Sequence, residues 1–307
     1  MNSAPQPQCP VPFLHRRARG LPPPPAVQRE IASLDATRDA QRIVQLLMSY
    51  EFPFDLVRAN ELALFHTFGS RSISTLLDRT GEFSKRGQKR YDDTRLLVGH
   101  FLECGLDDDT GRRALEHMNH IHSFYEIPND DYLFVLWTFI DFPIQWLAQY
   151  GRRAMTAHEQ AAWFNAWTEV GRRMKLTGIP MDKASYDAFV AAYEAREFVP
   201  CEASRRVADS TVAVLAAWLP RPLRGAVLPV AASLMRPQLR AALGYTAAPR
   251  WLSGLVHSVL KVRAGVKRFF SLERHPSFVA DASNRTYPGN AYEIEQLGPA
   301  HTHRPPK

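Results

Sequence analysis

Apolar residues recur every three or four positions through most of this chain, which is the period of an amphipathic helix. No stretch of useful length alternates apolar and polar residues as a half-buried strand would. We therefore expect an all-α fold in which many helices form one globular domain. The pattern predicts helices over 37–50, 53–67, 70–79, 86–104, 109–126, 130–150, 156–176, 182–196, 202–218, 222–243 and 250–270.

The two ends of the chain depart from this helical period. Residues 1–27 contain QPQCPVP and LPPPP, and a segment so rich in proline can neither continue a helix nor pack a core. We predict a disordered leader there. Residues 273–307 are polar and rich in Pro, Asn and His, which predicts an irregular tail. Residues 28–272 remain as the all-helical domain.

The run RALEHMNHIHSFY places three histidines within six residues of a helical segment. On a helix, His122 shares one stripe with Met118 and Tyr125, whereas His117 and His120 fall on the opposite side. The three imidazoles therefore cannot converge on one metal ion. We expect His122 to point inward and the other two to be solvated.

The run KRYDDTRLLVGHFLEC places a second polar pair on an apolar face. Arg90 and Thr94 share a stripe with Leu97, Phe101 and Cys104. Asp92 and Arg95 fall on the side that normally faces solvent. A buried arginine is costly unless it meets an anionic or strongly polar group, so Arg90 needs a partner.

On spacing alone, ordinary structural roles are favoured for these inward residues. Arg90 would form an ion pair with a buried carboxylate such as Asp55 or Glu61, and Thr94 would bond back to its own helix. His122 would be a hydrogen-bonded core residue. Spacing by itself leaves the function open.

The chain has 45% hydrophobic residues, a net charge of +7 and a sequence pI of about 9.4. Its basic residues are scattered, with no basic stripe interleaved with aromatic residues, so nucleic-acid binding is not predicted. The charge fits an anionic surface or an acidic ligand better. The segment 251–270, WLSGLVHSVLKVRAGVKRFF, combines apolar spacing with four cations, which suits contact with an anionic membrane and equally suits a solvated helix face.

The cysteines and the longest apolar run bear on the compartment. Three cysteines, Cys9, Cys104 and Cys201, are odd in number and far apart, which argues against a disulfide framework and against a zinc site. No secretory signal pattern is visible at the N-terminus. The apolar run 131–147 is interrupted by Asp141 and Pro143 and is too short to cross a bilayer. We expect a cytoplasmic protein, with at most peripheral contact to a membrane.

Several motifs in order resemble one known family. They are FPFDLVRANELALFHTFGSRSISTLLDRTGEF, KRYDDT, MNHIHSFYEIPNDDYLFVL and YGRRAMTAHEQAAWFNAWTEVGRRMKLTGIP. Together they resemble the MpaB-type oxygenases, which share their catalytic domain with latex clearing protein, the rubber oxygenase. The similarity runs from about residue 45 to RTYPGNAYEIEQLGP, most of the folded chain, so residues 28–272 would be the oxygenase catalytic domain.

This resemblance implies a haem b held between core helices, with a histidine as the proximal iron ligand. The matching histidine is His122, and the pair that lies on the distal side in the rubber-oxygenase branch matches Arg90 and Thr94. Arg90 would then act on bound dioxygen or on a haem propionate, and Thr94 would donate a hydrogen bond. That branch has an iron-binding lysine where this chain has Asp93, which is a poor substitute.

The resemblance also implies the reaction: a haem-dependent oxygenase that uses dioxygen to cleave a carbon–carbon double bond, or to hydroxylate, in a hydrophobic, isoprenoid or prenylated substrate. The aromatic-rich segment from Tyr132 to Trp146 would line the substrate pocket or simply pack the core. A carboxylate-bridged iron enzyme would need Glu-x-x-His, and no glutamate here has a histidine three residues later. The alternative is a non-catalytic helical protein that binds lipid or a membrane surface.

Overall fold

The computed structural model describes residues 25–269, 277–279 and 282–303, and within these ranges it contains helices and no strand. The predicted all-α fold is therefore confirmed. The α-helices are α1 (Pro25–Ser33), α2 (Ala40–Leu46), α3 (Pro53–Thr67), α4 (Arg71–Thr80), α5 (Glu82–Cys104), α6 (Asp109–His122), α7 (Asn129–Tyr150), α8 (Ala157–Arg173), α9 (Lys183–Glu197), α10 (Glu202–Ala217), α11 (Val227–Leu234), α12 (Pro237–Leu243) and α13 (Arg250–Phe269). Short π or 3₁₀ turns are η1 (Leu47–Glu51), η2 (Arg221–Ala226), η3 (Pro288–Asn290), η4 (Ile294–Gln296) and η5 (Ala300–Thr302).

Some predicted boundaries differ from the observed ones for local reasons. Helix α1 begins at Pro25, inside the segment predicted as a leader, and residues 1–24 lie outside the described residues. The single helix predicted over 222–243 is divided into η2, α11 and α12. Arg236 is extended (φ −63°, ψ 147°) because it precedes Pro237, whose ring disfavours a helical residue before it.

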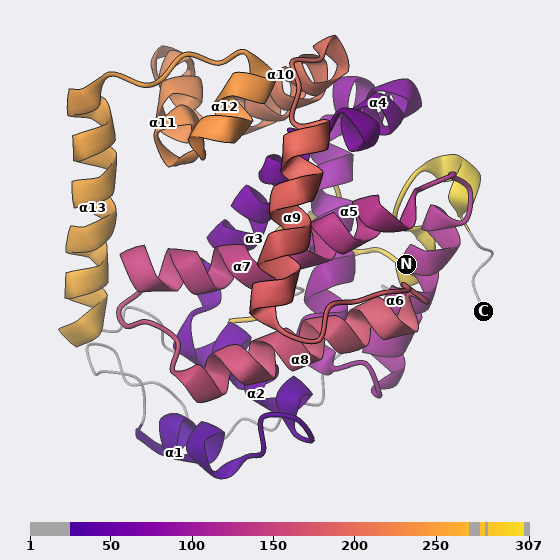
Figure 1. Cartoon of the computed structure of the whole chain (residues 1–307), viewed down its shortest axis with the longest axis vertical. Helices are drawn as coiled ribbons and strands as arrows, with labels where there is room; N and C mark the ends of the chain where they lie inside the picture. Colours follow the sequence, from indigo (N-terminus) through magenta and orange to yellow (C-terminus); the bar gives the residue numbers. More distant parts are fainter. Residues whose placement is uncertain (1–24, 270–276, 280–281, 304–307) are drawn as a thin grey trace.

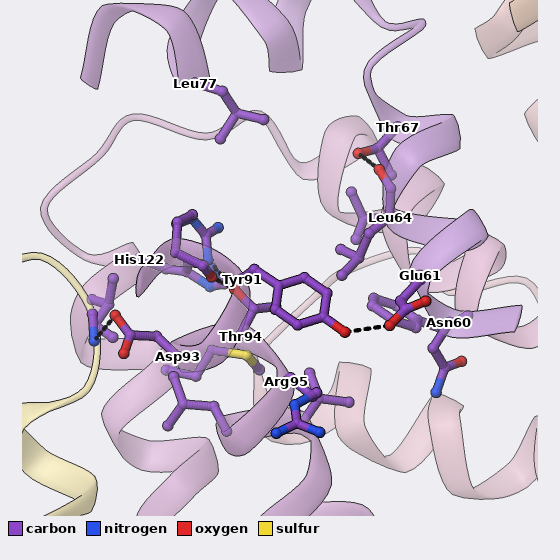
Figure 2. A pocket seen from close by; sticks show the side chains of 18 of the residues that line it. Asn60, Glu61, Leu64, Thr67, Leu77, Tyr91, Asp93, Thr94, Arg95 and His122 are labelled. Carbon is purple, nitrogen blue, oxygen red and sulfur yellow. Dashed lines mark hydrogen bonds between the residues drawn. The ribbon is translucent and has the colours of Figure 1, made fainter. Parts of the chain in front are cut away.

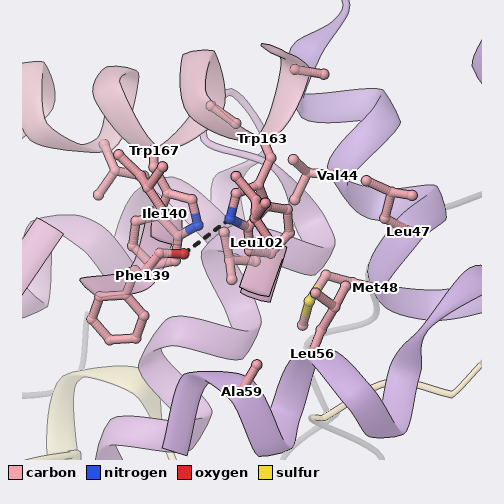
Figure 3. Close-up of a cluster of buried hydrophobic side chains, with 14 of the residues drawn as sticks. Val44, Leu47, Met48, Leu56, Ala59, Leu102, Phe139, Ile140, Trp163 and Trp167 are labelled. Carbon is pink, nitrogen blue, oxygen red and sulfur yellow. Dashed lines mark hydrogen bonds between the residues drawn. The ribbon is translucent and has the colours of Figure 1, made fainter. Parts of the chain in front are cut away.

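The main core lies where α7 crosses α3 and α8 (Figure 3). Trp163 is wholly buried and donates its indole N–H to the Phe139 carbonyl at 2.9 Å. The rings of Phe139 and Trp167 stack with centroids 4.5 Å apart. The aromatic-rich helix α7 therefore packs the centre of the molecule, and its buried Asp141 is neutralised by Lys183 and Arg236.

Helices α5 and α6 form a tightly joined pair. Asp108 caps α6 by accepting the backbone N–H of Thr110 at 2.9 Å. Gly105 has a φ of 89°, and a Cβ at Gly111 would lie only 1.9 Å from the Gly105 carbonyl oxygen. Two glycines therefore let the helices approach closely where they are joined.

The C-terminal tail, residues 277–279 and 282–303, packs along this pair (Figure 1). The Val279 N–H donates to Glu103 of α5 at 2.6 Å. Arg113 of α6 forms two hydrogen bonds, each of 2.8 Å, with the carboxylate of Glu295. Leu297 is fully buried. The tail, although irregular, is thus part of the core rather than a loose extension.

Helices α10, α11 and α12 gather at one end of the molecule, and α13 runs along its edge, where it contacts α11 and α7 (Figure 1). None of the helices within the described ranges combines the length and the apolar character needed to span a bilayer. Cys104 at the end of α5 is disulfide-bonded, a feature that the cysteine spacing did not predict, and Cys201 is a free thiol.

Candidate functional site

A cavity of about 340 Å³ lies between α3, α5, α6, α7 and α10. This volume is at the lower end of the range of about 300–1,000 Å³ that is typical of small-molecule and cofactor sites. Most of its wall is apolar, as in Leu64, Val98, Phe101, Val135, Phe139 and Leu215. The cavity therefore suits a largely hydrophobic occupant that would meet only a few polar groups.

Arg90 and Thr94 lie one turn apart on α5 and both line the cavity. Arg90 donates a hydrogen bond to the Thr94 hydroxyl, which itself donates to the Arg90 carbonyl at 2.9 Å. The Arg90 guanidinium lies 5.6 Å from the centre of the Phe83 ring. Burial lowers the pKa of Arg90.

The ion pair considered for Arg90 is not formed with either of the expected carboxylates. Asp55 pairs with Arg263 at 2.8 Å, and Glu61 pairs with Arg58 at 2.6 Å. Among the described residues, no carboxylate lies within ion-pair distance of Arg90. The threonine does bond back to its own helix, as that interpretation required. Arg90 thus holds a buried positive charge that no protein carboxylate meets directly.

His122 is the last residue of α6 and lines the same cavity. Its Nδ1 is buried and has no hydrogen-bond partner in the described part of the chain. The ring lies edge-on to Tyr132, with centroids 5.4 Å apart. Burial, and then the positive charge of Arg90, lower the pKa of His122 to about 4. The imidazole is therefore neutral at ordinary pH and keeps a lone pair for a ligand.

The structure thus brings Arg90, Thr94 and His122 to the wall of one cavity, with His122 and Thr94 facing it in Figure 2. His117 behaves differently from the prediction: it is buried, and its Nε2 lies 2.8 Å from the Leu297 carbonyl. His120 is half-buried and stacks on His117 at 6.1 Å. The expectation of a solvated His117 is wrong because the tail packs on that side of α6.

Asp93, between Arg90 and Thr94, borders the cavity but its oxygens are engaged by the tail. It accepts hydrogen bonds from the Tyr287 hydroxyl at 2.5 Å, the Gly298 N–H at 2.9 Å and the Lys89 ammonium at 2.6 Å. Asp92, predicted to face solvent, is also buried and accepts two bonds from Thr286. Both aspartates are structural, and each oxygen of Asp93 already accepts a hydrogen bond from the protein.

Sequence reasoning missed a second polar group in the cavity. Glu61 accepts a hydrogen bond from the Tyr91 hydroxyl, and burial raises the pKa of both residues (Figure 2). Arg95 and Asn60 also line this part of the wall. The helical period of α5 predicts that Arg95 faces solvent, whereas the structure places it at the cavity wall. The spacing of Tyr91 and Arg95, four apart on α5, was the only signal that they share a face.

A family model described as the catalytic domain of ER-bound oxygenase mpaB/B' and rubber oxygenase matches residues 101–263. That range includes α6 with His122 and follows Arg90 and Thr94.

Individual relatives extend the similarity beyond that range. The ER-bound oxygenase mpaB' of Penicillium brevicompactum is 30% identical over 265 residues, which is 80% of this chain and 62% of that protein. The ER-bound oxygenase mpaB of Penicillium roqueforti (strain FM164) is 29% identical over 235 residues, 71% of this chain and 79% of the relative. The chain therefore spans less than two thirds of the length of the first of these relatives.

Proposed function

The chain belongs to the family of mpaB-type and rubber oxygenases, and on that premise we propose that it is a haem-dependent oxygenase acting on a hydrophobic, isoprenoid or prenylated substrate. The reaction would be oxidative cleavage of a carbon–carbon double bond, or hydroxylation, with dioxygen. The observation that supports this best is the convergence of Arg90, Thr94 and an unpartnered His122 on one apolar cavity.

The residues around the cavity fit a porphyrin-held iron. A haem iron would need only one strong donor from the protein, and a neutral imidazole with a buried, unpartnered nitrogen would supply it. A bare metal ion would need several donors, and no group of three His, Cys, Asp or Glu residues in the described ranges could hold one. His122 would therefore hold the haem iron.

The cofactor and the residues of the cavity would have separate roles in the reaction. Haem, when bound, supplies the activation of dioxygen. His122 would hold the iron, and its lowered pKa keeps the nitrogen lone pair available through the neutral range. The Arg90 guanidinium, one nitrogen of which donates to the Thr94 hydroxyl, would present its other hydrogen-bond donors to negative charge that develops in the cavity, and Thr94 would add a donor by turning its hydroxyl proton away from the Arg90 carbonyl. The apolar wall excludes water from the reacting groups.

The apolar wall of the cavity favours a hydrophobic substrate. Tyr132, Val135 and Phe139 of α7 line it, whereas Trp137 and Trp146 of the same helix belong to the core and hydrogen-bond Asp187 and Asp55. Helix α7 therefore contributes side chains both to the cavity wall and to the core. A hydrocarbon chain such as a prenyl group buries well against such a wall without needing charged recognition groups.

Haem binding by the purified chain tests this proposal. The wild-type protein should show the intense haem absorption band, and His122→Ala should lose it. His120→Ala, at a half-buried histidine two residues before His122 on the same helix, is the matched control and should keep the band. A wild-type protein that takes up no haem, or a His122→Ala variant with unchanged haem affinity, would contradict the proposal.

A non-catalytic lipid- or membrane-binding protein is the second candidate function. It is favoured by the exposed apolar residues of α13, such as Trp251 and Val262, which a globular enzyme does not require. Peripheral membrane contact is compatible with either candidate. Protein that stays colourless with haem but binds anionic lipid vesicles would favour this second function.

A further inference from the structure

The polar groups of the cavity fall into two sets, one near each of two arginines of α5. The charge of Arg90 acts on His122, whereas the charge of Arg95 acts on Glu61 and Tyr91. Figure 2 shows Glu61 and Asn60 across the cavity from His122, with Tyr91 between them. The cavity therefore has a histidine end and a second polar end, and the proposed function uses only the first.

The second end holds one positive charge in excess. Glu61 is matched by Arg58 at 2.6 Å and by the Tyr91 hydroxyl. Arg95 has no carboxylate within ion-pair distance among the described residues, and its Nε is buried without a hydrogen-bond partner. The Oδ1 of Asn60 is likewise buried and unpartnered. Buried polar atoms normally find partners, so these mark a place that a ligand fills.

We propose that Arg95 and Asn60 form a subsite for a carboxylate at the end of the cavity opposite His122. Guanidinium donors match a carboxylate, and the Asn60 amide, whose unpartnered atom is its oxygen, would add a donor once its NH2 group is turned toward the ligand. Such a carboxylate would come either from a haem propionate or from the acidic head of an apolar substrate. Only the first source rests on the proposed function.

A pair of matched probes tests the subsite without haem. Dodecanoate and dodecanol share one alkyl chain and differ in the carboxylate, so their binding to the full-length protein is compared by titration calorimetry. The wild-type chain should prefer dodecanoate by about tenfold or more, the strength of a hydrogen bond between charged groups. Arg95→Gln should lose the preference, and Arg95→Lys should restore part of it.

Arg112→Gln, at an exposed arginine on α6, is the control and should behave as wild type. A preference for dodecanoate that survives Arg95→Gln, or no preference in the wild-type chain, would overturn the subsite. Because haem is absent from this experiment, its result does not depend on whether the proposed function is correct.

Haem and its dimethyl ester distinguish the two sources. If Arg95 holds a propionate, Arg95→Gln should weaken haem binding about tenfold and leave binding of the ester unchanged. If it holds a substrate acid, Arg95→Gln should lose only the preference for dodecanoate. A variant that changes neither haem binding nor that preference would contradict both forms of the proposal.

A second, independent observation concerns α13. Its inner face packs on the molecule through residues such as the buried Ala264. Its outer face carries five large apolar residues whose spacing of four, four, three and four places them on one stripe. These are exposed by 71%, 53%, 57%, 66% and 47% in Trp251, Leu255, Val259, Val262 and Val266, respectively.

The charge around this stripe is of one sign. Between Ser210 and Leu272 the sequence has nine Lys and Arg residues and no Asp or Glu. Arg250, Lys261 and Arg268 of α13 are exposed. Leu219 and Leu223, at and beside η2, are also exposed, by 38% and 54%. An apolar stripe in an entirely basic region matches the chemistry of an anionic lipid surface.

We infer that the outer face of α13 docks on an anionic membrane, with the stripe inserted among the acyl chains and the cations near the lipid phosphates. Two relatives carry "ER-bound" in their names, which is consistent with a membrane location in this family. Val214 and Leu215 of α10 line the cavity, and α10 contacts η2. Apolar substrate dissolved in the membrane would therefore have a short route to the cavity wall.

Vesicle sedimentation of the full-length protein tests the surface. Binding to phosphatidylcholine vesicles containing phosphatidylserine should exceed binding to pure phosphatidylcholine by about tenfold. The triple variant Leu255→Ser/Val259→Ser/Val262→Ser should lose binding to both. Met181→Ser, at an apolar residue 87% exposed outside α13, is the control and should bind as wild type.

These substitutions are on the surface, so circular dichroism should show an unchanged helical content. Undiminished vesicle binding by the triple variant would contradict the docking surface. A protein that forms a dimer through α13 and does not bind vesicles would contradict it as well, because the stripe would then be covered by a second copy.

Discussion

Both sides of the α5–α6 pair carry buried polar side chains, but the two sides differ in how well the hydrogen-bonding groups of these side chains are satisfied. On the side that faces the tail, Asp92, Asp93 and His117 are buried, and each has hydrogen-bond partners. On the side that faces the cavity, Arg95 and His122 keep buried nitrogens without partners. The hydrogen bonds of the first set hold the fold together, whereas the unmet nitrogens of the second set only cost stability until a ligand meets them, as the proposed function expects.

Removing a tail-facing group should cost the most. Asp93→Ala deletes the acceptor for Lys89, Tyr287 and Gly298 and leaves their donors unmet in the core. We expect the free energy of unfolding to fall by about 3 kcal/mol, as measured by urea titration. Asp93→Asn, which keeps the shape and one acceptor, should lose less. A loss below about 0.5 kcal/mol in Asp93→Ala, typical of surface positions, would erase the contrast between the two sides.

The ion pair between Arg113 and Glu295 should contribute less, and only above a certain pH. Arg113 lowers the pKa of Glu295 below its ordinary value of 4.5. The folded state therefore releases this proton more readily than the unfolded state, so the pair stabilises the fold above about pH 4.5, and this contribution is lost as the pH falls below it.

We expect Glu295→Gln to destabilise by about 1 kcal/mol at pH 7, since the pair is partly exposed. The difference from wild type should shrink on acidification to pH 3.5 or so. Unfolding curves at several pH values measure this. A difference that stays constant with pH would mean that Glu295 acts by packing rather than by its charge.

A cavity-facing group should respond with the opposite sign. His122→Phe replaces an imidazole with an unmet nitrogen by an apolar ring that suits the wall. We expect the ligand-free protein to gain about 1 kcal/mol of stability, since the cost of the unmet polar atom is removed, while haem binding is lost. A clear loss of stability would indicate that His122 has a structural role after all. Arg112→Ala, at an exposed pair on α6, should change stability by no more than about 0.5 kcal/mol in either direction.

The sequence alone predicted the helices and the inward stripes because both follow from a period that is local to each segment. Arg90, Thr94 and His122 were found in this way. His117 and Asp92 were misplaced because a helical wheel assumes one buried face, whereas α5 and α6 are covered on a second face by a tail far away in the sequence. Arg95 was misplaced because its side of α5 lines the cavity near Glu61 of α3 instead of facing solvent. The polar composition of that tail concealed its role, since only a few of its residues, such as Ile294 and Leu297, pack as apolar side chains, and many of its other contacts are hydrogen bonds and ion pairs.

The glycine contact between Gly111 and Gly105 acts at a distance. Arg90, Thr94 and His122 lie toward the open end of the α5–α6 pair, whereas the two glycines lie at its closed end. The two glycines set how closely α5 and α6 approach each other at the end where they are joined. A single methyl group at position 111 would push against the Gly105 carbonyl oxygen and displace α6 from α5. Over about the next ten residues of α6, this displacement would change the distance between His122 and Arg90. The width of the cavity between these two residues therefore depends on a contact between two glycines at the other end of the helix pair.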